Sequence, residues 1–144
     1  MAALDPLLHD VIVAAHRLTR IAAHSAGSTT PAAVWSTLSI LSTDGPLRIG
    51  DLAKMSRVSQ PSMTKLLQRL VEEELVYRIA DVEDSRAWLI AIGPKGTAAL
   101  GAWRVELSTQ LGPLFADLTT DEAEILQRAA RILTARTDTK RKVA

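Results

Sequence analysis

The sequence predicts a mainly α-helical fold with one small β-hairpin, and three features of the chain carry this prediction. Apolar residues recur at helical spacing over most of the 144 residues, with Pro and Gly between the runs. Two short helical stretches lie between residues 47 and 70, separated by a turn at Arg57 and Val58. Two strand-like runs, 76–80 and 87–92, then flank a polar loop. This order is that of a winged helix-turn-helix.

Two helices are expected before the helix-turn-helix. The first opens at residues 5–6 and ends before the Gly-Ser pair at 27–28. The second opens at the Thr-Pro pair at 30–31 and stops at the Asp-Gly-Pro sequence at 44–46. Each carries an apolar stripe, so both have a face to bury.

The helix-turn-helix itself begins at Leu47. Residues 47–56 carry apolar side chains only at the positions by which one short helix would pack against a core. Ser59 is suited to cap a second helix, and Pro61 suits a first turn because the amide it lacks has no helical partner there. One face of that helix is a buried stripe of apolar residues, Met63, Leu66, Leu67 and Leu70.

The opposite face of this second helix is polar. It offers hydroxyl, amide and ammonium groups where base edges and phosphates would lie, from Gln60, Ser62, Thr64, Lys65 and Gln68, with Arg57 in the turn before them. Any one of these residues is also what an ordinary solvated helix surface carries. As a group they favour contact with DNA.

Charge supports the DNA interpretation only locally. The whole chain carries 17 Lys and Arg against 16 Asp and Glu, so its composition predicts no general attraction to polyanions. Five basic residues between 48 and 69 face only Asp51, and they are Arg48, Lys54, Arg57, Lys65 and Arg69. Three glutamates follow at 72–74, so that end of the helix is expected to point away from phosphates.

The hairpin is expected to form the wing. Arg86 near its tip can enter a narrow minor groove, where the negative potential is enhanced. Asp84 is expected to support the wing by holding the Arg86 guanidinium in a bidentate pair. The alternative is a surface ion pair of little energetic value.

From Leu47 to Gly96 the sequence resembles the MarR family of bacterial transcriptional regulators. The residues that carry this resemblance are Leu52-Ala53, Val58-Ser59, Leu70, Leu75-Val76, Arg78, the Asp81-x-x-Asp84-x-Arg86 loop and Lys95-Gly96. The resemblance implies a winged-helix homodimer that binds a pseudo-palindromic operator and usually represses. It places Gln60, Ser62, Thr64 and Lys65 on the major groove and Arg86 in the minor groove.

The chain departs from the family pattern at three places. Glu74 stands where the family commonly has Gly, at a cost of roughly 1 kcal/mol if the backbone there is left-handed. Ser85 stands where a second Arg is common, which predicts a shallower salt dependence of DNA binding. Gly93 and Pro94 replace the usual Thr cap of the next helix, although Pro94 still suits a first helical position.

The C-terminal third is expected to be helical and to form a dimer with the N-terminal helix. Pro94 opens a helix that the Gly-Pro pair at 112–113 bends or ends, and residues 119–122 spell a capping box before a last apolar stripe. These terminal helices are more apolar than a monomer of this size needs. We therefore expect one domain over 1–144, with a DNA-binding lobe at 30–93 and helical dimerisation regions at 1–26 and 94–137. The alternative is that the same stripes close a monomeric core. The basic tail at 140–142 is expected to be a solvated, frayed end, and the alternative is a contact with phosphate.

Several kinds of function are disfavoured. The chain has no cysteine, which excludes sensing through a reactive thiol. Its three histidines, His9, His16 and His24, are spaced too widely along one helix to hold a tetrahedral metal ion alone, so neither a metal nor a cofactor is expected. No glycine-rich fingerprint or catalytic spacing indicates an enzyme. No apolar run of membrane length and no signal peptide is present, which predicts a cytoplasmic protein.

Two questions stay open at the level of sequence. The resemblance implies an effector cleft between the dimerisation helices and the DNA-binding lobe that accepts aromatic anions. The candidate lining residues are His16, Arg17, Arg20, Trp35 and Trp103, because rings and cations suit such a ligand, although core packing also explains the two tryptophans. The alternative function is a winged helix used only for protein contacts, which would not need the basic patch or Arg86.

Overall fold

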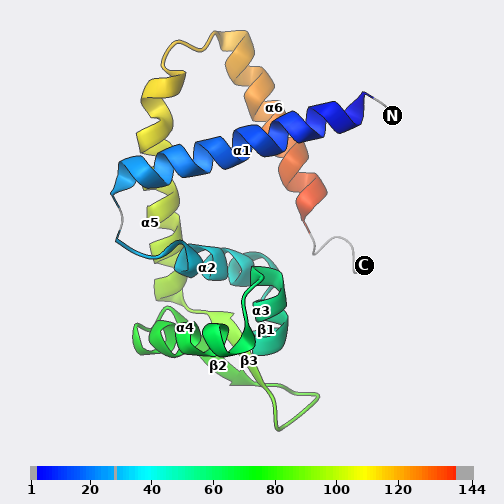
Figure 1. Ribbon diagram of the computed structural model, residues 1–144, viewed down its shortest axis with the longest axis vertical. Helices are drawn as coiled ribbons and strands as arrows, with labels where there is room; N and C mark the ends of the chain where they lie inside the picture. Colours follow the sequence, from blue (N-terminus) through cyan, green and yellow to red (C-terminus); the bar gives the residue numbers. More distant parts are fainter. Residues whose placement is uncertain (1–2, 28, 139–144) are drawn as a thin grey trace.

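A computed structural model describes residues 3–27 and 29–138 and confirms a mainly helical chain with a small β-sheet (Figure 1). In chain order the elements are α1 (Leu4–Ala26), α2 (Ala32–Asp44), β1 (Leu47–Arg48), α3 (Ile49–Ser56), α4 (Gln60–Glu72), β2 (Val76–Ala80), β3 (Trp88–Ile92), α5 (Pro94–Leu111), the 3₁₀ turn η1 (Gly112–Phe115) and α6 (Thr120–Thr137). The basic tail at 140–142 lies outside the described residues.

The helices begin and end where the local sequence predicts. Gly27 takes a left-handed conformation with φ of 60° and ends α1. The Ser59 hydroxyl accepts a hydrogen bond from the amide of Ser62 at 3.2 Å and caps α4. Thr119 and Glu122 exchange both hydrogen bonds of a capping box at the start of α6. These boundaries depend on nearest neighbours in the chain, so the sequence was sufficient to predict them.

The sheet has one strand more than the sequence predicted. Its strands lie in the order β1-β3-β2, all antiparallel, and β1 pairs through Leu47 with Ile90 and through Arg48 with Leu89. The expectation that residues 47–56 are helical throughout is wrong at the first two of them. A strand of two residues shows no periodicity, and its partner lies some forty residues away in the chain.

The core sits between α2, the helix-turn-helix and the sheet, and α5 reaches it through Leu100. Its buried members come from α2, α3, α4, β2, β3 and α5, and they are Val34, Leu38, Leu41, Leu52, Ala53, Met63, Leu67, Leu70, Val76, Ile90 and Leu100. Glycine permits one close approach at its edge, because a Cβ on Gly96 would collide with the Leu75 carbonyl oxygen. The start of α5 is thereby packed directly against the end of the helix-turn-helix.

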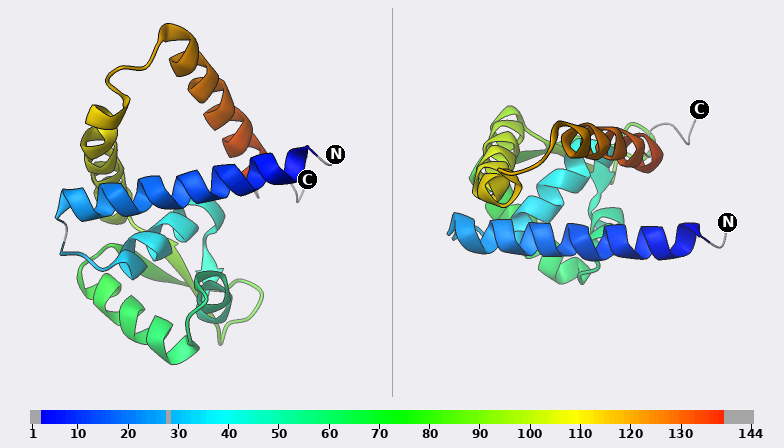
Figure 2. Two further views of the ribbon diagram at one scale, coloured as in Figure 1. Left: turned by 45° about the horizontal axis from the view of Figure 1, so that its top comes forward. Right: turned by 90° about the horizontal axis from the view of Figure 1, so that it is seen from above.

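The terminal helices form an open frame above this lobe (Figure 2). The C-terminal part of α1 packs crosswise against α5, whereas α1 and α6 cross in the view of Figure 1 and are separated when seen from above. None of the residues of α6 is fully buried. Its large apolar side chains are exposed, namely Ile125, Leu126, Ile132 and Leu133, as are Leu4, Leu7, Leu8, Ile12 and Ile21 of α1. The alternative that these stripes close a monomeric core is therefore wrong for α6.

A left-handed residue follows α4. Glu74 has φ of 61°, as the comparison with the family pattern led us to suspect, and it leads the chain out of the helix so that the Leu75 amide donates to the Leu70 carbonyl at 2.9 Å. A side chain with a Cβ is strained in this conformation and glycine is not.

Replacing Glu74 with glycine is therefore expected to raise the free energy of unfolding by about 1 kcal/mol. Urea denaturation followed by circular dichroism measures the change. The control is Glu72→Gly at the last residue of α4, whose helical backbone gains nothing from glycine and should lose stability. Equal losses in both variants would show that the left-handed backbone at Glu74 carries no strain.

Candidate nucleic-acid interface

The exposed face of α4 forms an open groove. Its lining comes from one side of the helix and comprises Gln60, Pro61, Thr64, Lys65 and Gln68, around a hollow of about 700 Å³. The opposite side of the helix carries Met63, Leu67 and Leu70, each at most 1% exposed. Because three buried side chains fix the rotation of α4, the four polar side chains are held outward together. The groove offers hydrogen-bond donors and acceptors in a row, which is what direct contact with base edges requires.

Ser62 lies apart from this row. Its hydroxyl is hydrogen-bonded to the Ser59 hydroxyl, with 2.8 Å between the two oxygens. It also lines a smaller hollow of about 160 Å³ between α4 and α2 rather than the groove. The Ser62 side chain is exposed but shares its hydrogen-bonding capacity with the helix cap. Ser62 therefore lies at the flank of α4, and its contact with DNA stays a prediction.

Arg57 forms the turn between α3 and α4. Its φ of 57° is left-handed, its amide donates to the Lys54 carbonyl at 3.1 Å, and the next amide, of Val58, donates to the Ala53 carbonyl at 3.1 Å. Glycine is the usual residue at such a helix end, so this position carries an exposed cation at a cost in backbone strain.

The basic patch is smaller than the sequence suggested. Arg69 pairs with Glu73 one turn later, with 3.0 Å between Nε and Oε1, and Arg48 pairs with Asp81. Each of these two guanidinium groups already has a carboxylate partner, so its charge is at least partly neutralised. Lys54, Arg57 and Lys65 are exposed and take no part in the ion pairs found among the described residues. The positive surface near the groove is therefore carried by these three residues and by the wing.

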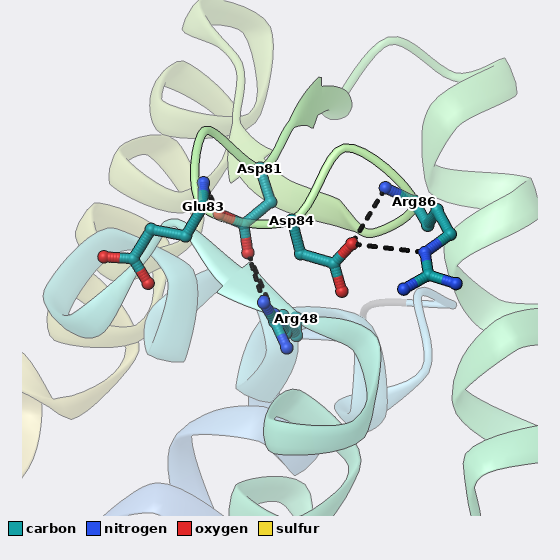
Figure 3. A network of polar contacts seen from close by, with 5 residues as sticks. All are labelled: Arg48, Asp81, Glu83, Asp84 and Arg86. Carbon is teal, nitrogen blue, oxygen red and sulfur yellow. Dashed lines mark hydrogen bonds and ion pairs between the residues drawn. The ribbon is translucent and has the colours of Figure 1, made fainter.

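The wing presents Arg86 almost entirely to solvent (Figure 3). Its side chain is 94% exposed, and its Nε lies 3.8 Å from Asp84 Oδ1, which is a loose ion pair. The predicted bidentate pair between these residues is wrong. Asp84 instead accepts a hydrogen bond from the backbone amide of Arg86 at 3.0 Å. The short Asp side chain bonds more readily to the backbone amide two residues later than to the flexible guanidinium of the same residue. Asp84 thus supports the wing by shaping its turn, and Arg86 is left free.

The base of the wing holds a contact that the sequence analysis missed. Arg48 donates from both Nε and Nη2 to Asp81 Oδ2, at 3.0 and 2.6 Å, while the other oxygen of Asp81 accepts from the Glu83 amide at 3.0 Å (Figure 3). The hydrogen bond from Arg48, followed by that from Glu83, lowers the pKa of Asp81, and the pair raises the pKa of Arg48. The sequence offered no signal for it beyond a lone Asp at the start of the loop.

A separate hollow lies above the lobe, between α1, α2 and α5. Trp35 and Trp103 stack there with ring centroids 4.9 Å apart and 8° between their planes. They line a space of about 370 Å³ together with small or hydroxyl-bearing side chains, Thr19, Ala23, Ala32, Ser36 and Ser39. The indole Nε1 of Trp35 is buried and has no hydrogen-bond acceptor among the described residues.

The structure brings the two predicted tryptophans of this hollow together but not the predicted cations. His16, Arg17 and Arg20 are exposed on α1 and do not line it, since the lining turns of α1 present Thr19 and Ala23. The cation beside the hollow is Arg104 of α5, whose Nη2 donates to the Ser39 hydroxyl at 3.1 Å. A helix wheel alone could not tell which side of α1 faces α2 and α5.

Comparison with protein families and curated proteins points to one group. The model of the MarR family matches residues 31–88, which span the helix-turn-helix and the wing. The HTH-type transcriptional regulator ML2140 of Mycobacterium leprae is 30% identical over 98 residues, covering 68% of each chain. The HTH-type transcriptional regulator MT0903.1 of Mycobacterium tuberculosis is 29% identical over 133 residues, covering 92% of this chain and 93% of the relative.

Solved structures show the same fold. A point mutant of MepR of S. aureus, bound to an oligodeoxyribonucleotide, superposes with a TM-score of 0.62 at 20% identity over 91% of this chain and 98% of that one. MepR bound to ethidium bromide gives a TM-score of 0.59 at 20% identity over 90% and 95%. At this identity the likeness concerns the fold.

Residues 3–27 and 29–138 contain neither a candidate membrane span nor a candidate metal site. No helix in this part of the chain combines the length and the apolar character that a bilayer span requires. No group of three or more His, Cys, Asp or Glu side chains in it is placed to bind a metal ion.

Arg57→Gly separates the two roles of the turn. We expect the free energy of unfolding to rise by about 1 kcal/mol, because glycine relieves the left-handed backbone, while affinity for DNA falls with the loss of one cation. The slope of log Kd against log salt should become shallower by about 0.9 if Arg57 contacts one phosphate. Denaturation and anisotropy titration measure the two effects, and an unchanged affinity and slope would exclude Arg57 from the DNA interface.

Proposed function

The chain belongs to the MarR family of helix-turn-helix transcriptional regulators, which bind DNA, and from that premise we propose that it is a homodimeric repressor of a pseudo-palindromic operator, released by a small-molecule effector. The observation that carries this proposal is the polar groove of α4 together with a wing arginine that is 94% exposed. The family consists of transcriptional regulators rather than enzymes, and the proposal needs no catalytic group. Since its target is chromosomal DNA, we place its action in the bacterial cytoplasm.

The two surfaces are proposed to read different parts of the duplex. Gln60, Thr64, Lys65 and Gln68 face the major groove, where amide, hydroxyl and ammonium groups distinguish base edges. Arg86 enters the adjacent minor groove, and its exposed guanidinium has no strong partner to leave behind when it does so. Ser62 at the flank of α4 and Arg57 in the turn contact phosphates and fix the register.

The second copy of the chain is proposed to cover the exposed apolar stripes of α1 and α6. Side chains such as Ile125 and Ile132 are 62% and 60% exposed, which costs free energy until a partner buries them. We assign the dimerisation regions to residues 1–26 and 94–137 and the DNA-binding lobe to 30–93. A two-fold axis between the frames would place two copies of α4 about one DNA turn, roughly 34 Å, apart.

The effector is proposed to be a planar aromatic molecule bound in the hollow beside Trp35 and Trp103. The stacked rings offer a flat apolar wall, and Arg104 at the edge favours a negative group. MepR, which shares the fold, has been solved with the planar ligand ethidium. A ligand that prefers the DNA-incompetent dimer by about 2.7 kcal/mol lowers operator affinity about a hundredfold.

Anisotropy titration against the DNA directly upstream of the chain's own gene, with a scrambled duplex of equal length and a salt series, tests the regulator. We expect nanomolar binding by one dimer with at least a thousandfold preference, and roughly tenfold weaker binding by Lys65→Ala or Arg86→Ala. Arg131→Ala on α6 is the control, because it removes an equal charge far from the groove. Equal, weak and steeply salt-dependent binding to both duplexes would contradict specific recognition there and support a module for protein contacts.

Tryptophan fluorescence tests the effector site, because the chain has three tryptophans and only two line the hollow. Salicylate, as an aromatic anion, should quench the emission and release the operator. Trp103→Leu should abolish both effects, whereas Trp88→Phe on the wing, the matched control, should retain the release. Release that survives in Trp103→Leu would place the effector elsewhere.

A further inference from the structure

The ion pair between Arg48 and Asp81 connects the wing to the start of the helix-turn-helix. Arg48 ends β1 and immediately precedes α3, whereas Asp81 immediately follows β2 on the far side of the sheet. We propose that Arg48 is a wing-positioning residue, which holds the hairpin at a set angle to α4. At this angle Arg86 enters the minor groove of the duplex while the polar face of α4 enters the adjacent major groove. This inference rests on the DNA binding proposed above and adds a residue that does not itself contact DNA.

The sheet register shows how the pair spans the structure. Arg48 is opposite Leu89 of β3, and Leu89 is opposite Ile79 of β2, so these three residues form one row across the sheet. Asp81 is two residues beyond Ile79, where side chains return to the same face. The long Arg48 side chain therefore reaches over β3 and joins the two outer strands at the point where the wing loop leaves the sheet.

The contact is well made at both ends. Asp81 uses both carboxylate oxygens, Oδ2 for the Nε and Nη2 of Arg48 and Oδ1 for the amide of Glu83. Its side chain is 11% exposed, so water competes less than at an open surface pair, although Arg48 is 47% exposed. One carboxylate thus ties the first turn of the wing loop to the residue that begins the helix-turn-helix.

The tip of the wing is held mainly by hydrogen bonds within its own loop, from the Asp81 amide to the Ala87 carbonyl at 3.1 Å and from the Ala87 amide to the Asp84 carbonyl at 3.0 Å. Val82 is 99% exposed and the Arg86 side chain is 94% exposed, so the loop beyond Asp81 buries almost nothing at its tip. The Asp84 carboxylate orders the turn internally, and the dashed lines from it in Figure 3 lead to Arg86 of the same loop. Without the Arg48–Asp81 pair, the free hairpin would sample more orientations. Binding to DNA would then cost more conformational entropy, and the affinity would be lower.

The alternative role for Arg48 is a direct phosphate contact, which its place in the basic sequence patch first suggested. The two roles predict opposite effects of freeing the guanidinium. If Arg48 positions the wing, removal of the Asp81 charge weakens DNA binding. If Arg48 binds phosphate, the same change releases a cation and strengthens it.

The test is a double-mutant cycle with Arg48→Gln, Asp81→Asn and the double variant, measured by anisotropy on the operator duplex across a salt series. We expect each single variant to bind about fivefold more weakly, the double variant to be no weaker than the worse single variant, and the salt slope to stay unchanged. In a protein that already carries Arg86→Ala, Arg48→Gln should cause little further loss of DNA affinity, because the Arg86 guanidinium that the pair positions is already absent. Arg69→Gln, which breaks the exposed pair with Glu73, is the charge-matched control and should not show this dependence on Arg86.

Tighter binding by Asp81→Asn, or a slope made shallower by about 0.9 in Arg48→Gln alone, would overturn the proposal and make Arg48 a phosphate contact. Hydrogen exchange on the free protein provides a measurement that does not depend on DNA. Amides of residues 82–87 should exchange faster in both single variants than in the wild type, and unchanged exchange would also overturn the proposal. A wild type that binds no duplex specifically, with faster exchange in the variants, would instead refute the proposed function and leave the wing tether in place.

Discussion

The surface proposed to contact DNA depends on one constraint, the burial of one side of α4. Met63, Leu67 and Leu70 pack into the core with at most 1% of their surface exposed. A helix with three side chains held in this way cannot rotate about its axis without exposing them to water, at roughly 1.5 to 3 kcal/mol each. The groove lined by Gln60, Thr64, Lys65 and Gln68 is therefore rigidly presented, although its own side chains make few contacts. Specific recognition requires this, because ordering a mobile surface on binding reduces the affinity.

The ends of α4 show how the chain accommodates that constraint. At the start, Ser59 caps the helix and Arg57 accepts a left-handed turn, and at the far end Glu74 accepts another. Both strained residues are charged where glycine is the usual choice. At Arg57 the strain keeps a cation beside the groove, so stability is given up at a position that suits binding. For Glu74 the structure supplies no comparable use.

The two halves of the molecule are stabilised differently. The lobe has its own core from Val34 to Leu100, whereas α6 extends from the frame with no buried residue. The hollow beside Trp35, the proposed effector site, is lined by α1, α2 and α5, where frame and lobe meet. The same α2 also borders the small hollow behind Ser62 at the start of α4. A movement of α1 or α5 relative to the lobe can therefore be transmitted through α2 to the start of α4.

The sequence by itself determined the features that depend on neighbours within a few residues. The caps at Ser59 and Thr119, the buried stripe of α4 and the exposed position of Arg86 follow from local spacing and residue type, whereas the left-handed Glu74 was expected only from the family pattern. Only the tertiary structure decided which charges are neutralised and which helix faces meet. Arg48 and Asp81 are 33 residues apart, β1 exists only because β3 offers it an edge, and α1 turns Thr19 rather than Arg17 toward the tryptophans. Such pairings depend on how whole elements pack against one another, and periodicity along the chain does not encode the direction of that packing.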